Sequence, residues 1–100
     1  MRIEFRDKRL ERVENGSAAE LATCGVPLGI IGTLRRRIAQ IRAAMDERDL
    51  RNIKSLHFEK LQGAKGERSI RINGNWRLIF LTLEESHPHT IAILRVEDYH

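Results

Sequence analysis

The side chains in this sequence with the clearest capacity for chemistry fall in two places. Asp98, Tyr99 and His100 directly follow an apolar stretch, and they supply a carboxylate, a phenol and an imidazole that can accept or donate a proton. Arg71 and Arg77 lie upstream in apolar segments, where a guanidinium can bind the oxygens of an anion through parallel hydrogen bonds. Residue types alone leave an alternative open, because a polar C-terminal tail often only frays into solvent.

A β-hairpin is predicted to position the two arginines. Residues 67–73 alternate polar and apolar side chains as a strand does. Residues 76–83 are apolar on both faces apart from Arg77, which is typical of a buried central strand. Asn73-Gly74 between them is a strong turn signal, because glycine adopts positive φ without steric cost.

The register of this hairpin follows from its side chains. A loop of residues 73–75 sets Ile70 opposite Leu78 and Arg71 opposite Arg77, so the apolar pairs share one face and the two arginines share the other. A two-residue loop would mix the faces. An anion bound between the two like charges would remove the cost of placing them together.

The other elements complete an α+β pattern. Residues 2–6 alternate as a short strand, residues 7–14 have helical spacing, residues 49–56 are the expected connector, and residues 90–97 form a last strand. Apolar residues recur three and four positions apart between residues 29 and 48, which predicts one long helix with a buried stripe. The stripe comprises Ile31, Leu34, Ile38, Ile41 and Met45. We therefore expect an N-terminal strand and helices packed on one face of a small antiparallel sheet.

Length and charge narrow the class of protein. The chain has 100 residues, which predicts a single domain over residues 1–100, and it carries 18 Lys and Arg against 14 Asp and Glu, for a net charge of +4. Fourteen of the 18 basic residues are arginine, which raises the expectation of a polyanionic partner, although many small basic proteins bind none. We find no secretory leader pattern and no apolar run that could span a bilayer, and one cysteine excludes an internal disulfide. These features predict a cytoplasmic protein.

Motifs for cofactors and metals are not evident. The sequence has no phosphate-binding glycine loop, and His87-Pro88-His89 reads as a solvated turn rather than a metal site. Cys24 has no nearby histidine to activate it and is interpreted as a small packed residue. We therefore expect no metal and no cofactor.

Residues 61–80 (Leu-Gln-Gly-Ala-Lys-Gly-Glu-Arg-Ser-Ile-Arg-Ile-Asn-Gly-Asn-Trp-Arg-Leu-Ile-Phe) and 96–100 (Val-Glu-Asp-Tyr-His) resemble the HigB-type toxins of the RelE superfamily. The opening Phe-Arg-Asp-Lys-Arg-Leu-Glu of residues 5–11 is similar to that family as well. The resemblance covers most of the chain, and the Asn-Trp-Arg step and the terminal Glu-Asp-Tyr-His are its most specific parts. It is loose around residues 16–33.

The resemblance implies a type II toxin that cuts messenger RNA in the ribosomal A site without a metal. The ribose 2′-OH would attack the adjacent phosphorus, leaving a 2′,3′-cyclic phosphate and a 5′-OH. A cognate antitoxin, in many cases a HigA-type helix-turn-helix protein, would neutralise the toxin and repress the operon. Operator DNA would then be contacted only through the antitoxin.

The chemistry implied by the resemblance needs a base, a positive clamp for the phosphorane and an acid for the leaving oxygen. His100, Asp98 and Tyr99 can serve as acid, base or phosphate donor, Arg77 is the best clamp, and Arg71 is its neighbour. Two further groups could bind RNA phosphates: Lys65 and Arg68 beside the expected cleft, and Arg35, Arg36 and Arg37 on the long helix. A solvated helix face explains that triplet equally well.

One segment departs from the family pattern. Some members carry His and Lys before the second strand, and an ungapped match puts Glu59 and Gln62 at those positions. A shift of one residue matches His57 and Lys60 instead, and residues 63–69 form a loop one residue shorter than usual. Since other members have Glu at the His position, Glu59 is favoured as a catalytic carboxylate, with His57 and Lys60 as secondary candidates.

Two rival hypotheses use the same residues differently. The chain could be a nucleic-acid-binding module without catalysis, which would not need the last three side chains. It could also be a RelE-like interaction protein that keeps the fold and has weak or no activity, as the altered residues at 59 and 62 would allow.

Overall fold

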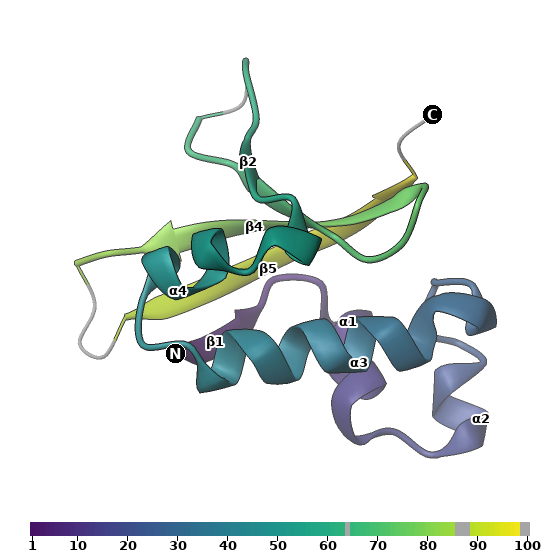
Figure 1. Ribbon diagram of the computed structural model, residues 1–100. Coiled ribbons are helices and arrows are strands. Elements are labelled where there is room, and N and C mark those ends of the chain that lie inside the picture. Colours follow the sequence, from purple (N-terminus) through teal and green to yellow (C-terminus); the bar gives the residue numbers. More distant parts are fainter. Residues whose placement is uncertain (64, 86–88, 99–100) are drawn as a thin grey trace.

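A five-stranded sheet with helices across one face builds the molecule, as the computed structural model of residues 1–63, 65–85 and 89–98 shows (Figure 1). Along the chain the elements are β1 (Arg2–Phe5), α1 (Lys8–Asn15), α2 (Ala18–Leu21), α3 (Leu28–Ala43), α4 (Glu47–Asn52), the 3₁₀ helix η1 (Lys54–Leu56), β2 (Glu59–Lys60), β3 (Arg68–Arg71), β4 (Trp76–Leu83) and β5 (Thr90–Asp98). None of the helices in the described residues has the length and apolar character needed to cross a bilayer.

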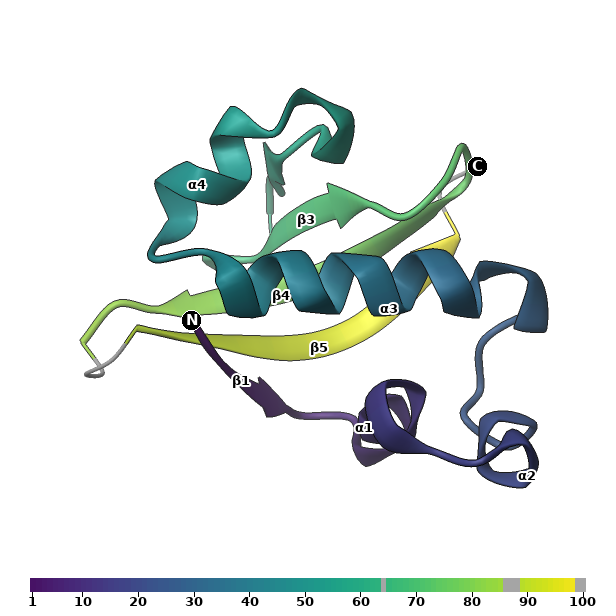
Figure 2. The same cartoon turned by 60° about the horizontal axis from the view of Figure 1, so that its bottom comes forward.

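The strands lie in the order β1-β5-β4-β3-β2, and β4 is central as predicted. β2 to β5 pair antiparallel, whereas β1 pairs parallel with β5, with Ile3 opposite Ile91 and Phe5 opposite Ile93. The expected α+β class is confirmed, but the sheet is mixed rather than wholly antiparallel. The reason is that β1 and β5 are not consecutive strands. The chain forms the helices and β2 to β4 before β5 takes its place beside β1, so the two strands can run in the same direction (Figure 2).

The predicted hairpin register is confirmed. Ile70 pairs with Leu78 and Arg71 with Arg77, and the Ile72 N–H donates to the Trp76 carbonyl at 2.8 Å. Because neighbouring side chains on a strand point to opposite faces, one face receives the isoleucines and leucine and the other receives the two arginines. We call the second one the open face, since α3 lies across the first.

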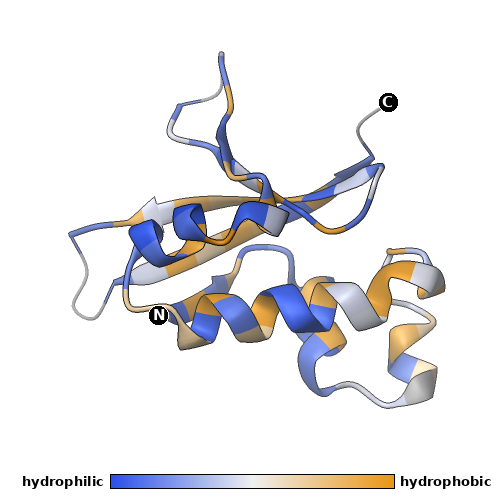
Figure 3. Ribbon diagram, viewed as in Figure 1, coloured by the Kyte–Doolittle hydropathy of each residue, from blue (hydrophilic) through white to orange (hydrophobic). Residues whose placement is uncertain are grey.

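The core lies between α3 and the sheet. The apolar stripe of α3 is fully buried from Leu34 to Ile41, and it belongs to one cluster with Leu78, Phe80 and Ile93 of the sheet. Hydrophilic residues alternate with this hydrophobic stripe along α3 in Figure 3. Burying each such side chain contributes roughly 1.5–3 kcal/mol, so this layer supplies most of the stability of the fold. Cys24 is also buried in the cluster, as its interpretation as a packed residue predicts.

The long helix ends earlier than the sequence predicts. α3 stops at Ala43, and Asp46 begins a separate helix, α4, by accepting a hydrogen bond from the Arg48 N–H at 2.9 Å. Aspartate is among the residues preferred at the N-cap of a helix, so a new helix begins at Asp46 and the chain changes direction there. The prediction that Met45 continues the buried stripe is therefore wrong, because Met45 is 85% exposed. The expected connector, residues 49–56, is largely helical, since it holds the end of α4 and η1.

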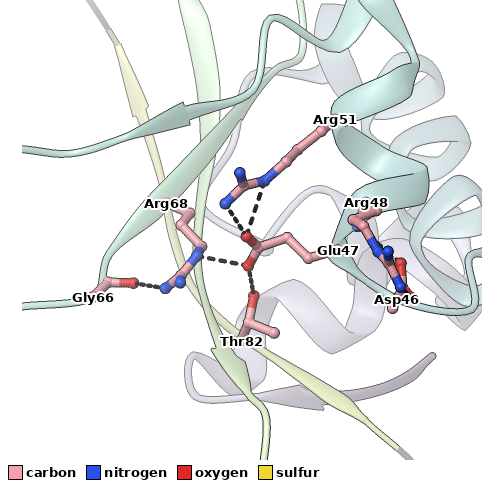
Figure 4. Close-up of polar contacts among 7 residues, drawn as sticks. All are labelled: Asp46, Glu47, Arg48, Arg51, Gly66, Arg68 and Thr82. Atoms are coloured by element: carbon pink, nitrogen blue, oxygen red, sulfur yellow. Dashed lines mark hydrogen bonds and ion pairs between the residues drawn. The ribbon is translucent and has the colours of Figure 1, made fainter.

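Glu47 ties α4 to the sheet. Its carboxylate accepts from Thr82 Oγ1 at 2.7 Å and from Arg51 at 2.5 Å, and it lies 2.6 Å from Arg68 Nε (Figure 4). Burial opposes ionisation of Glu47, but the hydrogen bonds from Thr82 and Arg51 and the charges of Arg68 and Arg51 outweigh it. The pKa of Glu47 consequently lies below its ordinary value.

We expect Glu47→Gln to lower the free energy of unfolding by about 1–3 kcal/mol at pH 7, because the ion pair to Arg68 is lost within a shielded site. A carboxyl with a depressed folded-state pKa stabilises the fold above its unfolded pKa, and this contribution disappears as the pH falls below about 4.5. The difference between wild type and variant should thus shrink in acid. Urea unfolding at pH 7 and at pH 4 measures it. Glu4→Gln, in an exposed pair with Arg6, is the matched control and should change little. An equal effect of both substitutions would contradict this role for Glu47.

Candidate active site

A hollow of about 320 Å³ opens beside the β3–β4 hairpin. Its lining residues come from the segment after η1, from β2 and from the hairpin: His57, Glu59, Arg71, Asn73, Gly74 and Arg77. Arg71 and Arg77 enter it from the open face, directly opposite one another. Four of the residues that sequence analysis singled out therefore meet in one place, namely His57, Glu59, Arg71 and Arg77.

Arg77 is fixed by neighbours on several elements. It is only 7% exposed, and its Nε donates to Ser69 Oγ at 2.7 Å. One terminal nitrogen donates to the carbonyl of His57 and also lies 4.0 Å from a Glu59 carboxylate oxygen. These contacts join β4 to β3 and to the segment that leads into β2. Arg77 thus presents a positive charge with little freedom to move.

Arg71 is the less buried of the pair. Its Nε donates to the Asn73 carbonyl at 3.1 Å, and its NH1 lies 3.4 Å from Nε2 of His57. Since a guanidinium can only donate, this contact requires Nε2 of His57 to act as the acceptor. The Arg71 carbonyl in turn accepts from Arg37 Nε of α3 at 2.8 Å, so the helical layer holds this strand in place. Burial lowers the pKa of Arg37, and the charges of Arg36 and Arg71 lower it further.

His57 has a backbone conformation that few residues other than glycine adopt. Its φ is +44°, in the left-handed region, where it ends η1. This conformation costs an L-residue roughly 1–2 kcal/mol. Its N–H donates to the Lys54 carbonyl at 3.1 Å and its carbonyl accepts from Arg77. The strained turn aims the chain so that the imidazole meets Arg71 and the next residues enter β2.

The proposed RNA-binding residues lie outside the hollow. Lys65 is exposed in the β2–β3 loop, and Lys60 is exposed on β2, opposite Arg68. Arg68 is half-buried against Glu47 on the helical face. On α3, Arg35 donates to the Val13 carbonyl at 2.5 Å, and Arg36 donates to Thr33 Oγ1 at 3.0 Å.

The C-terminal candidates are only partly described. Asp98 ends β5 opposite Trp76, whereas Glu97 is the residue directly opposite Arg77. By strand alternation Asp98 therefore belongs to the face that Arg77 does not share. Tyr99 and His100, like His87 and Pro88, lie outside the described residues, and their predicted roles stay predictions.

Sequence reasoning missed three contributors to the site. Ser69 is fully buried, and its Oγ accepts the Nε–H of Arg77. Asn73 lines the hollow, and Glu97 lies directly opposite Arg77 on β5. Strand alternation put Ser69 on the Arg71 face, so it could have been found. Glu97 could not be paired in advance, because a β-bulge between Ile79 and Phe80 shifts the β4–β5 register.

Comparison with known proteins identifies the family of this chain. A family model described as "RelE-like toxin of type II toxin-antitoxin system HigB" matches residues 3–93. The chain belongs to the HigB family of RelE-like toxins. It is 40% identical over 82 residues to Toxin HigB-1 of Vibrio cholerae serotype O1 (strain ATCC 39315 / El Tor Inaba N16961), covering 80% of this chain and 82% of that protein. HigB toxins belong to toxin–antitoxin systems, so membership in the family implies an antitoxin partner.

A solved structure extends the likeness to the fold. The YoeB/ParE toxin from Agrobacterium tumefaciens superimposes with a TM-score of 0.59 over 100% of both chains, at 12% sequence identity. At that identity the likeness concerns the arrangement of helices and strands. The expected RelE-like architecture of this HigB-family chain is thereby confirmed.

The different contacts of the two arginines predict different effects on stability. Arg77→Met removes the donors to Ser69 Oγ and the His57 carbonyl, and we expect it to lower the free energy of unfolding by about 2–4 kcal/mol. Arg71→Met, at the more exposed partner, should cost less than about 1 kcal/mol. Urea denaturation of both variants measures the difference. Equal destabilisation would contradict the bracing role assigned to Arg77.

Proposed function

We propose that this HigB-family chain is a ribosome-dependent endoribonuclease that cuts messenger RNA without a metal and acts in the cytoplasm. The observation that supports this most directly is that Arg71 and Arg77 are paired in the β3–β4 register and both line the same hollow. Two like charges so close favour an anion between them, and a phosphodiester is the anion that RNA supplies. Glu59 at the rim, 4.0 Å from Arg77, adds a proton acceptor.

The proposed reaction is an in-line displacement. The ribose 2′-oxygen forms a bond to the adjacent phosphorus and loses its proton to a base, while the bond from phosphorus to the 5′-oxygen breaks and that oxygen takes a proton from an acid. The products are a 2′,3′-cyclic phosphate and a 5′-OH. Negative charge grows on the non-bridging oxygens, which is where fixed guanidiniums lower the barrier.

The residues divide these tasks as follows in the proposal. Arg77 and Arg71 bind the phosphorane oxygens, and Glu59 accepts the 2′-OH proton, because its carboxylate is 56% exposed and open to substrate. His57 is the second candidate base, with Lys60 a further candidate for binding phosphate. His100 is the proposed acid, Tyr99 stacks on a base or donates to phosphate, and Asp98 orients one of them.

Binding extends beyond the hollow in this proposal. Lys65 and the α3 residues Arg35 and Arg36 contact phosphates of the message or of ribosomal RNA, which a net charge of +4 supports. Arg68 contributes least to RNA binding in this proposal, since it is already paired with Glu47. The proposed antitoxin is a HigA-type helix-turn-helix protein, through which alone the toxin would approach operator DNA.

We expect the full-length chain to arrest growth when expressed without its antitoxin, and a version ending at Glu97 to be harmless.

Glu59→Gln should reduce cleavage by about 10²-fold or more, as removal of a general base does. Transcripts from arrested cells should carry 5′-OH ends, which a kinase labels without prior phosphatase treatment. Glu4→Gln, on β1, is the control and should remain toxic. If the full-length chain arrests growth yet leaves transcripts intact, the catalytically inactive binding module is the better description.

A further inference from the structure

Arg95 spans the open face beside the hollow. It lies on β5 directly opposite Ile79, and its terminal nitrogens donate to both carboxylate oxygens of Glu67, at 2.7 and 3.2 Å. Because β4 lies between β5 and β3 in the sheet, the Arg95 side chain must cross β4 to reach the residue that precedes β3. Ile79 is fully buried although it faces away from the helices, because the Arg95 side chain covers it.

Arg95 also holds a second carboxylate. Its Nε donates to Glu97 Oε1 at 2.5 Å. Hydrogen bonds to Glu67 first, and then to Glu97, raise the pKa of Arg95 above its ordinary value, and the same contact with Arg95 lowers the pKa of Glu67. The three side chains thus form a charge-assisted chain along the open face.

The contact between Arg95 and Glu97 matters because of where Glu97 lies in the sheet. Glu97 is the residue directly opposite Arg77 on β5, and side chains opposite one another on antiparallel strands are close enough to pair. A carboxylate that turned to Arg77 would compete with an incoming phosphate for the same guanidinium. Arg95 is the neighbouring cation that instead engages Glu97.

We propose that Arg95 is a positioning residue that holds the Glu97 carboxylate away from Arg77 and so keeps the hollow receptive to an RNA phosphate. This rests on the proposed function, and it adds a residue outside the hollow that sets its affinity. Glu97 is then an internal competitor of the substrate, kept from competing by the bridge from Arg95 to Glu67 and Glu97.

The alternative is a general effect of charge, in which Arg95 attracts RNA simply by being positive. Glu67 provides the matched comparison, because it is a carboxylate on the same face and bonds to the same arginine, but it is not opposite Arg77. Arg95→Lys provides a second comparison, since it keeps the charge while a single ammonium lacks the fork that engages both carboxylates.

The experiment measures binding of a fluorescent single-stranded RNA decamer, made uncleavable by 2′-deoxy substitution, to the full chain at fixed salt. We expect Arg95→Met to weaken binding about tenfold, as for competition from one charge-assisted hydrogen bond. Adding Glu97→Gln should restore most of that loss, whereas adding Glu67→Gln should not. Arg95→Lys should weaken binding several-fold. Urea unfolding of each variant separates these effects from loss of structure.

Each remaining outcome has a definite meaning. Equal rescue by the two glutamine substitutions, or full binding by Arg95→Lys, would show a general charge effect and overturn the role of Arg95. If wild type binds the decamer and Arg71→Met does not weaken it, the hollow is not the RNA site and the proposed function fails first. If wild type does not bind the decamer at all, the hollow is not receptive to an RNA phosphate by itself and the role of Arg95 fails, whereas ribosome-dependent cleavage is judged separately by the 5′-OH ends of transcripts from arrested cells. Rescue by Glu97→Gln alone, with Arg71→Met defective, supports both.

Discussion

The pairing of β3 with β4 is the constraint on which the rest of the molecule depends. With Ile70 opposite Leu78 and Arg71 opposite Arg77, the apolar side chains of the first pair turn to α3 and the two guanidiniums of the second pair turn away from it. A slip of one residue would carry Arg77 into the core and Leu78 to the open face. Burying an unpaired charge there costs several kcal/mol, so the same packing that stabilises the fold also fixes the site.

The two arginines of the hollow are held in different ways, and the difference has a chemical meaning. Arg77 uses its hydrogen bonds to hold Ser69 and the turn at His57, so its charge is fixed before any substrate arrives. Arg71 has fewer constraints and contacts an imidazole at the rim. A fixed charge needs no reorganisation when negative charge develops, whereas a more mobile one can follow the substrate. Under the proposed function, one guanidinium of each kind suits a phosphate that changes shape during the reaction.

Local pattern predicted the parts of this structure that short-range rules decide. The hairpin, its loop of residues 73–75 and the central place of β4 follow from alternation and turn chemistry. The end of α3 did not, because the stripe continues to Met45 in sequence while Asp46 begins another helix in space. β2 is two residues long, too short to leave a periodic signal.

The site shows the same division between local and long-range determinants. Arg71 and Arg77 were placed together from the sequence, since a single hairpin carries both. The partner of Arg68 could not be predicted, because Glu47 comes from a helix 21 positions earlier. The residue opposite Arg77 on β5 could not be predicted either, because the register shift between Ile79 and Phe80 moves β5 by one residue. Continued without that shift, the pairing of Phe80 with Ile93 would set Val96 opposite Arg77, whereas the shifted register sets Glu97 there.

The likeness to the YoeB/ParE toxin at 12% identity shows how little of the sequence this architecture requires. Core positions need only volume and apolarity, so many residues can fill them. On the open face, by contrast, arginines and carboxylates form specific pairs, Arg95 with Glu67 and Glu97 and Arg77 with Glu59. Function in this fold is therefore carried by side chains that packing does not need. Arg95 illustrates this: it covers one isoleucine, as many residues could, yet only a forked cation can engage Glu67 and Glu97 at once.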